Sequence, residues 1–163
     1  GELTAVRPPR GVWMWYPDPD PAKESGEGKR FFIRTVDLPA EPVLAVVKCW
    51  ADDKAKIFVN GDEIFQVTYY NDPKREEVTK TMSCGKNFIA IEAENSIGAA
   101  GLLFEMEIQL ADGSQMFLSG DDKWKVTDKA PENWITSEPS GDKWKEPKML
   151  GKGLIKPWNH IDW

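Results

Sequence analysis

Hydrophobic and polar residues alternate through most of the central part of the chain. The clearest run is 102–110, where every second position is apolar and the positions between are mostly polar. Leu102, Phe104, Met106 and Ile108 share one face of this run, and Glu105 and Glu107 lie on the other. A period of two predicts a strand with one buried and one solvated face. Similar alternation predicts strands at 44–51, 55–59 and 89–94.

Turn signals separate these runs. Asn60-Gly61 supplies the positive backbone angles of a two-residue hairpin, and 64–67 follows as the partner strand. Asp112-Gly113 predicts a second hairpin onto 116–118, and 124–126 reads as a further short strand. No segment shows the spacing of an amphipathic helix. About eight strands with frequent turn signals predict an all-β sandwich.

Three segments are predicted loops: 17–28, 69–80 and much of 127–153. The last is long, but it carries Trp134, Trp144, Met149 and Leu150, which we expect to fix it to the sandwich. We find neither an internal repeat nor an interdomain linker, so 1–163 is predicted to be a single domain.

Composition and charge exclude some classes of function. The chain has 163 residues and a net charge of −6, and its lysines and arginines are interspersed with acids. Nucleic-acid binding requires clustered positive charge, so it is not expected. No run approaches the ~18 apolar residues of a membrane span, so membrane insertion is not expected either. Cys49 and Cys84 could form one disulfide, or Cys49 could be a buried free thiol.

Three segments carry a resemblance to a known family: RFFIRTVDLP at 30–39, ADDKAKIFVNG at 51–61 and GKNFIAIEAEN at 85–95. In this order they resemble the galactose-binding-like accessory domains of bacterial glycoside hydrolases, such as α-rhamnosidases, family 2 β-galactosidases and sialate esterases. The resemblance covers about 13–158. It implies a jelly-roll β-sandwich cut from a larger secreted bacterial protein, located outside the cell, in the periplasm or at the cell surface.

Aromatic residues are the first candidates for a binding site, because sugar rings stack on aromatic faces while polar groups bind the hydroxyls. Tyr69, Tyr70, Asn71 and Trp134 lie in predicted loops, where binding residues concentrate. Trp15 is a further candidate; in an extended segment it would share a face with Trp13. By contrast, Trp124, Trp144 and Trp158 fall on landmarks of the resembled family and are expected to be packing anchors.

Acidic and amide residues are candidates for a metal site. Asp52 and Asp53 end one predicted strand, and Asn95 ends another. Oxygen ligands at strand ends suit Ca²⁺, and structural calcium is common in the resembled fold. The alternative is that Asp52 and Asp53 simply cap a turn.

Catalysis is not expected. His160 is the single histidine, and no serine or cysteine lies in a nucleophile motif. A glycosidase needs only two carboxylates in a groove, and composition alone does not exclude that third possibility.

We therefore expect a monomeric, non-catalytic module that binds a polysaccharide or oligosaccharide and targets a larger secreted protein to a glycan. The alternative is a structural or docking domain with no sugar site, which would contact neighbouring domains of the parent protein. The two hypotheses differ in whether Trp15, Tyr69, Tyr70 and Trp134 line one cleft or form a flat patch.

Overall fold

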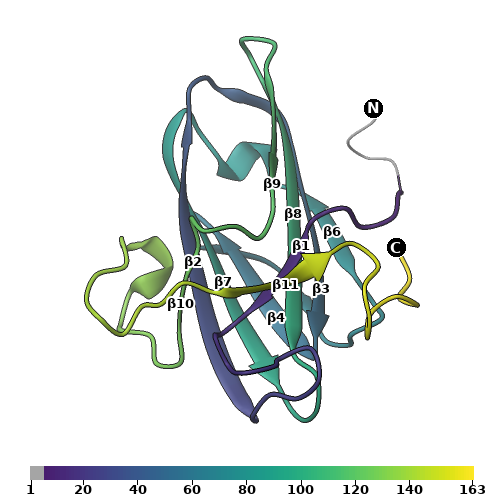
Figure 1. Ribbon diagram of the computed structural model, residues 1–163. Helices are drawn as coiled ribbons and strands as arrows, with labels where there is room; N and C mark the ends of the chain where they lie inside the picture. Colours follow the sequence, from purple (N-terminus) through teal and green to yellow (C-terminus); the bar gives the residue numbers. More distant parts are fainter. Residues whose placement is uncertain (1–5) are drawn as a thin grey trace.

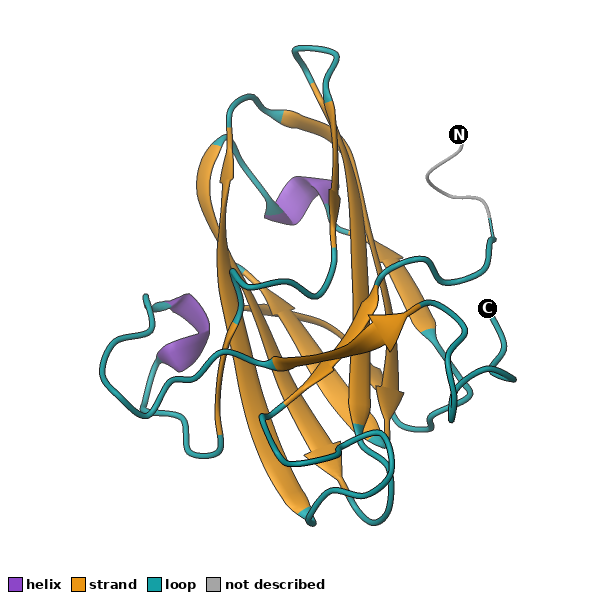
Figure 2. Ribbon diagram, in the orientation of Figure 1, coloured by secondary structure: helices purple, strands orange, loops and turns teal. Residues whose placement is uncertain are grey.

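The computed structural model describes residues 6–163 and consists almost entirely of strands and loops (Figures 1 and 2). Two antiparallel sheets lie face to face, which confirms the predicted all-β sandwich. The six-stranded sheet has the order β11-β1-β8-β3-β6, with β9 paired to β8. Its strands are β1 (Val12–Trp15), β3 (Pro42–Asp52), β6 (Lys74–Glu77), β8 (Gly101–Leu110), β9 (Gln115–Leu118) and β11 (Lys148–Lys152).

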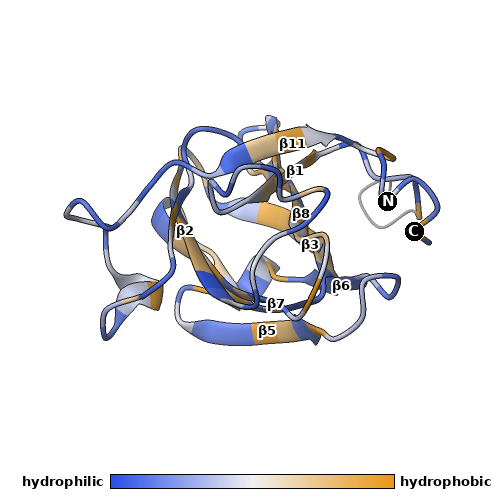
Figure 3. Ribbon diagram, turned by 60° about the horizontal axis from the view of Figure 1, so that its bottom comes forward, coloured by the Kyte–Doolittle hydropathy of each residue, from blue (hydrophilic) through white to orange (hydrophobic). Residues whose placement is uncertain are grey.

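The five-stranded sheet has the order β10-β2-β7-β4-β5. Its strands are β2 (Gly28–Leu38), β4 (Lys54–Val59), β5 (Asp62–Val67), β7 (Gly85–Asn95) and β10 (Lys125–Thr127). Among the described residues, the single-turn 3₁₀ helices η2 (Thr79–Thr81) and η3 (Trp134–Thr136) lie in the connections. Figure 3 shows the sheets as two layers, with hydrophobic residues along β8 and hydrophilic residues both in the loops and along part of β5.

Both predicted hairpins are present. Asn60 and Gly61 have φ angles of 49° and 87° and join β4 to β5, while Gly113 has a φ of 88° between β8 and β9. The structure also contains β6 and β11 in segments predicted as loops. Both strands pair at the edges of the six-stranded sheet. Their side chains are largely exposed, so they show no buried alternation from which a strand could be predicted.

The main core fills the space between the sheets. Alternate residues of β8 face inward, so Phe104, Met106 and Ile108 are fully buried within it. The ring of Phe104 meets the edge of Trp124, with the ring centroids 5.2 Å apart. Trp124 also donates a hydrogen bond from Nε1 to the backbone oxygen of Ser119 at 2.8 Å. Trp124 is therefore a packing anchor, as predicted.

A second apolar cluster lies on the outer side of the six-stranded sheet. Its buried members are Trp13, Trp50, Leu103, Trp158 and Ile161. Trp13, Leu103 and Trp50 form a row across β1, β8 and β3. Trp158 stacks on Trp13 with a centroid distance of 4.1 Å and an interplanar angle of 14°. The cluster therefore holds the C-terminal segment, which follows β11, against the sheet.

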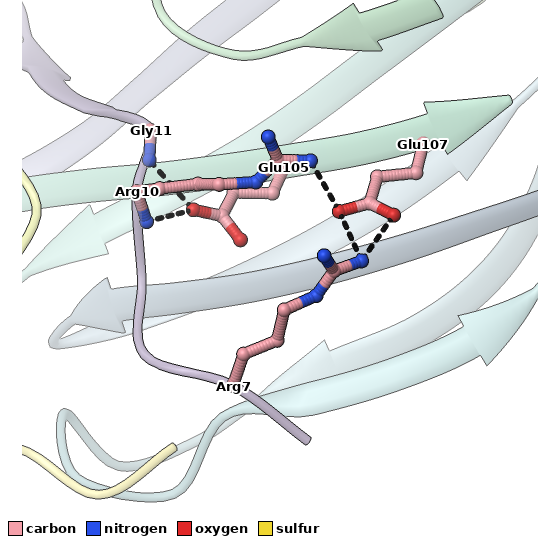
Figure 4. Close-up of polar contacts among 5 residues, drawn as sticks. All are labelled: Arg7, Arg10, Gly11, Glu105 and Glu107. Carbon is pink, nitrogen blue, oxygen red and sulfur yellow. Dashed lines mark hydrogen bonds and ion pairs between the residues drawn. The ribbon is translucent and has the colours of Figure 1, made fainter. Parts of the chain in front are cut away.

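Two glutamates of β8 hold the segment that precedes β1 (Figure 4). Glu105 accepts hydrogen bonds from the backbone N–H groups of Arg10 and Gly11, both at 2.7 Å. Glu107 forms ion pairs with the guanidinium groups of Arg7, at 2.6 Å, and Arg10. Glu105 is buried, and both backbone bonds go to its Oε2 oxygen. The outer face of β8 thus carries apolar packing at one end and charged packing at the other.

The two cysteines do not pair. Cys49 is buried and free, and Cys84 is exposed and free. Burial raises the pKa of the Cys49 thiol far above its usual range, so this thiol is unreactive. Within residues 6–163, no helix is long or apolar enough to cross a membrane.

The first prediction concerns the main core. Replacing Phe104 by Ala should lower the free energy of unfolding by about 3–5 kcal/mol, because it removes a buried ring and leaves a cavity beside Trp124. Urea denaturation followed by tryptophan fluorescence measures this change. The matched variant is Phe117→Ala on the neighbouring strand β9, where the ring is 38% exposed. A loss for F104A no larger than the loss for F117A would contradict the described packing.

Candidate functional site

Two adjacent carboxylates stand where β3 ends and β4 begins. Asp52 accepts a hydrogen bond from Trp158 Nε1 at 3.0 Å. Asp53 accepts one from the backbone N–H of Ser96 at 2.7 Å, and its own N–H donates to the carbonyl of Glu94 at 3.1 Å. The C-terminal segment thus holds Asp52, and the end of β7 holds Asp53.

The environment of Asp52 disfavours its negative charge. Partial burial raises the pKa of the Asp52 carboxyl to about 6. The hydrogen bond from Trp158 opposes this shift, while Asp53 adds to it through a side-chain hydrogen bond and like charge. A pair of acids this close is a place where a cation or a hydrogen-bond donor would be stabilised.

The turn between β5 and β6 lies against the same C-terminal segment. Tyr70 Oη is 3.4 Å from His160 Nε2. Asn71 donates from Nδ2 to Asp162 Oδ2 at 3.3 Å and accepts from the Asp162 backbone N–H. Tyr69 meets the edge of Tyr70, with centroids 4.9 Å apart, and its side chain is 55% exposed. The turn therefore presents an exposed aromatic ring beside an ordered polar network.

The acids and the tyrosine turn belong to one surface. Tyr70 packs against the cluster that contains Trp158, and Trp158 binds Asp52. The pKa of Tyr70 is raised, first by its contact with Tyr69 and in smaller part by the charge of Asp52. We call this surface the edge site, and its members are Asp52, Asp53, Tyr69, Tyr70, Asn71, His160 and Asp162.

The edge site joins residues that the sequence suggested for two different purposes. Asp52 and Asp53 were predicted as metal ligands, and Tyr69, Tyr70 and Asn71 as sugar ligands. His160 and Asp162 were not predicted as members. No sequence signal places them there, because their position depends on the C-terminal segment folding back over the Trp13–Trp158 stack.

Asn95 has a different environment. Its side chain is fully buried, and Nδ2 donates to the carbonyls of Ser25 at 3.0 Å and Gly26 at 3.2 Å. The Asn95 amide therefore holds the 17–28 loop, although its Oδ1 is buried and makes no hydrogen bond. Among the residues the structure describes, no group of three His, Cys, Asp or Glu side chains is placed to hold a metal ion.

The prediction for Trp15 needs correction. Trp15 is 1% exposed and packs in the main core, with its ring 5.8 Å from that of Phe32, so neither face is open to a ligand. It also does not share a face with Trp13, which belongs to the outer cluster. Met14 and Trp15 are adjacent in β1 and both lie in the main core, so the alternation on which the prediction rested ends between them.

Trp134 lies away from the edge site, over the other sheet. It begins η3, and its ring is 5.4 Å from Phe31 of β2 and 6.4 Å from Trp144. These contacts fix the 127–153 loop to the sandwich, as expected. The four aromatic candidates thus neither line one cleft nor form one patch.

Comparisons with known proteins find similarity to part of a rhamnosidase and to part of a lectin. The chain is 29% identical, over 157 residues, to an α-L-rhamnosidase of Streptomyces avermitilis. The match covers 91% of this chain but only 15% of that enzyme. The crystal structure of the same Streptomyces enzyme with L-rhamnose superposes with a TM-score of 0.87 at 27% identity, over 96% of this chain and 16% of that one. The chain matches none of the established family models.

A fungal lectin shares the fold as well. The apo structure of the Pleurotus ostreatus lectin has a TM-score of 0.85 at 27% identity, over 96% of this chain and 46% of the lectin. The rhamnosidase of Bacillus sp. GL1 has a TM-score of 0.76 at 18% identity, which shows the fold alone. The resemblance to galactose-binding-like accessory domains is confirmed. The chain spans only a small part of the rhamnosidases, so their activity is not transferred to it.

The second prediction uses the raised pKa of Asp52. A carboxyl with a pKa of about 6 when folded and ~3.9 when unfolded binds its proton more tightly in the folded state. Its ionisation therefore destabilises the fold above pH 6, and this cost disappears as the pH falls towards 4. In calcium-free buffer, Asp52→Asn should stabilise the protein relative to wild type at pH 7.5 but not at pH 4. Thermal unfolding at both pH values measures the difference. An equal effect at both would show that Asp52 titrates normally.

Proposed function

We propose that this chain is a non-catalytic carbohydrate-binding module that keeps a larger extracellular or cell-surface protein on a glycan. The observation that carries the proposal is the edge site, where exposed aromatic surface adjoins carboxylate and amide groups. The likeness to a lectin and to a small part of a rhamnosidase supports sugar binding by this fold. Tethering to a glycan would raise the effective concentration of a linked catalytic domain.

The edge site has the groups that sugar recognition requires. Tyr69 offers a ring on which pyranose C–H groups can stack. Asp52 and Asp53 accept hydrogen bonds from hydroxyls, and the Asn71 amide can both donate and accept. The tryptophan cluster beneath holds Tyr70, and Asp162 holds Asn71, so both are ordered before a ligand arrives. Such preorganisation lowers the entropic cost of binding.

We further propose that Asp52 and Asp53 hold Ca²⁺. Two neighbouring carboxylates suit a hard cation, and burial of Asp52 beside Asp53 leaves negative charge that Ca²⁺ would neutralise. Bound Ca²⁺ would supply positive charge for sugar hydroxyl oxygens. Asn95 ends β7 and uses its amide to hold the 17–28 loop, so it is left out of this donor set.

A docking domain is the second candidate. Tyr69 and Trp163 are 55% and 47% exposed and could pack on a neighbouring domain of a parent protein. The polar network of Asn71 and Asp162 favours the sugar site, because an interface core is usually depleted of charged groups.

The third prediction tests sugar binding. We expect the domain to bind at least one member of a panel containing L-rhamnose, N-acetylgalactosamine and plant and algal polysaccharides. Tyr70→Ala and Asn71→Ala should each weaken this binding about tenfold or more, measured by isothermal titration calorimetry and affinity electrophoresis. Phe117→Ala removes an exposed ring elsewhere and is the matched control. Absence of binding across the panel by the folded wild type would favour the docking domain.

The fourth prediction tests the metal. Adding Ca²⁺ to chelator-treated protein should raise its midpoint of thermal unfolding, because a ligand that binds only the folded state stabilises it. Asp52→Asn and Asp53→Asn should abolish the shift, while Asp112→Asn, in an exposed turn, should retain it. A shift that survives in both edge-site variants would place the ion elsewhere.

A further inference from the structure

The outer face of the five-stranded sheet carries a second set of convergent groups. At one end, η3 lies over the sheet, and the ring of Trp134 contacts the rings of Phe31 and Trp144. Trp134 remains only partly buried after making these contacts. The indole is therefore held in one orientation while part of its surface is still open.

Two hollows meet on this face. The first measures about 280 Å³ and is lined by Phe58, Glu92, Asn133, Trp134 and Ile135. The second measures about 250 Å³, and its charged and amide lining is Lys29, Lys54, Lys56, Gln66, Glu92 and Glu94. Each hollow lies just below the usual size range of a small-molecule site. Because Glu92 lines both, they adjoin and form one groove across β7 and β4.

Glu92 is positioned at the junction by two lysines. Its carboxylate lies 3.6 Å from Lys29 Nζ on β2 and 3.9 Å from Lys56 Nζ on β4. The Glu92 side chain keeps 24% of its surface exposed, so it can still accept hydrogen bonds from a ligand. The sheet register places Phe31, Glu92 and Lys56 side by side on three neighbouring strands. A carboxylate held on rigid strands is better placed for recognition than one on a free loop.

We propose that this groove is a second glycan-binding site, which takes an oligosaccharide of at least two sugar units. One ring stacks on Trp134 and Phe58, with its hydroxyls bound by Asn133 and Glu92. The next unit lies over Lys54, Lys56 and Gln66, whose side chains supply hydrogen bonds to hydroxyls. The proposal rests on the proposed function, because it assumes that the domain binds glycans.

The edge site lies where β3 passes into β4 and where β5 leads towards β6, whereas the stacking end of the groove, at Trp134, lies over β2, β7 and β4. One polymer, or two, can therefore occupy both. A domain with two sites binds a polymer more tightly than either site alone, because the second contact forms at high effective concentration. A single sugar unit gains nothing from this effect. The expected behaviour is therefore strong retention on a polymer and weak binding of monosaccharides.

The fifth prediction separates the two sites by stoichiometry. Isothermal titration calorimetry with cellotetraose, xylotetraose and a rhamnose-containing tetrasaccharide should show two sites per wild-type domain for at least one of them. Trp134→Ala and Glu92→Gln should each weaken the groove about tenfold or more and leave one strong site. Tyr70→Ala should leave only the groove. Ile97→Ala and Lys152→Ala, on exposed positions outside both sites, are the matched controls.

A second readout guards against a merely structural effect of Trp134→Ala. In the Tyr70→Ala background, the tetrasaccharide should shift the indole N–H resonance of Trp134, assigned by its absence in Trp134→Phe. E92Q should reduce this shift while keeping the wild-type thermal midpoint. The wild type could instead show a single site that Tyr70→Ala removes and Trp134→Ala leaves intact. That result would overturn the groove proposal but uphold the proposed function. Absence of binding by the wild type would overturn both.

Discussion

The stacking of Trp158 on Trp13 is the contact on which the edge site depends. It holds the C-terminal segment against the outside of the six-stranded sheet. Three indole N–H groups of this cluster then each donate a hydrogen bond to a different residue. Trp13 donates to the carbonyl of Gly153, Trp50 to that of Asp162, and Trp158 to the carboxylate of Asp52. Buried indoles usually find such partners. Two of these partners, Asp52 and Asp162, are members of the edge site.

The same contact constrains its neighbours. Gly101 lies directly beneath Trp158, and a β-carbon at this position would come within 2.4 Å of the ring. Only glycine lets the ring approach the strand so closely. The N–H of Trp158 also favours the ionised form of Asp52 and so opposes burial and Asp53, which together raise the pKa of this carboxyl. Packing and electrostatics at this edge are therefore inseparable.

The two sheets use their outer faces differently. The six-stranded sheet covers its outer face with the chain's own ends: the tryptophan cluster holds the C-terminal segment, and Glu105 and Glu107 hold the segment before β1. The five-stranded sheet leaves a row of lysines and glutamates partly open and covers only its apolar end with η3. This difference explains why the edge site includes residues of the C-terminal segment, whereas the groove is built on strands.

The sequence by itself determined the sandwich, its two hairpins and its main core. These follow from alternation at 102–110 and from Asn60-Gly61 and Asp112-Gly113, which act over short distances. It also indicated Asp52 as a candidate metal ligand and Tyr70 and Trp134 as candidate sugar-binding residues. Only the tertiary structure decided which of them meet. Trp15 turns into the main core together with its neighbour Met14, and η3 places Trp134 over the other sheet. The C-terminal segment folds back and brings His160 and Asp162 beside Tyr70 and Asn71. Each of these outcomes rests on contacts between residues far apart in the chain, and local pattern carries no information about such contacts.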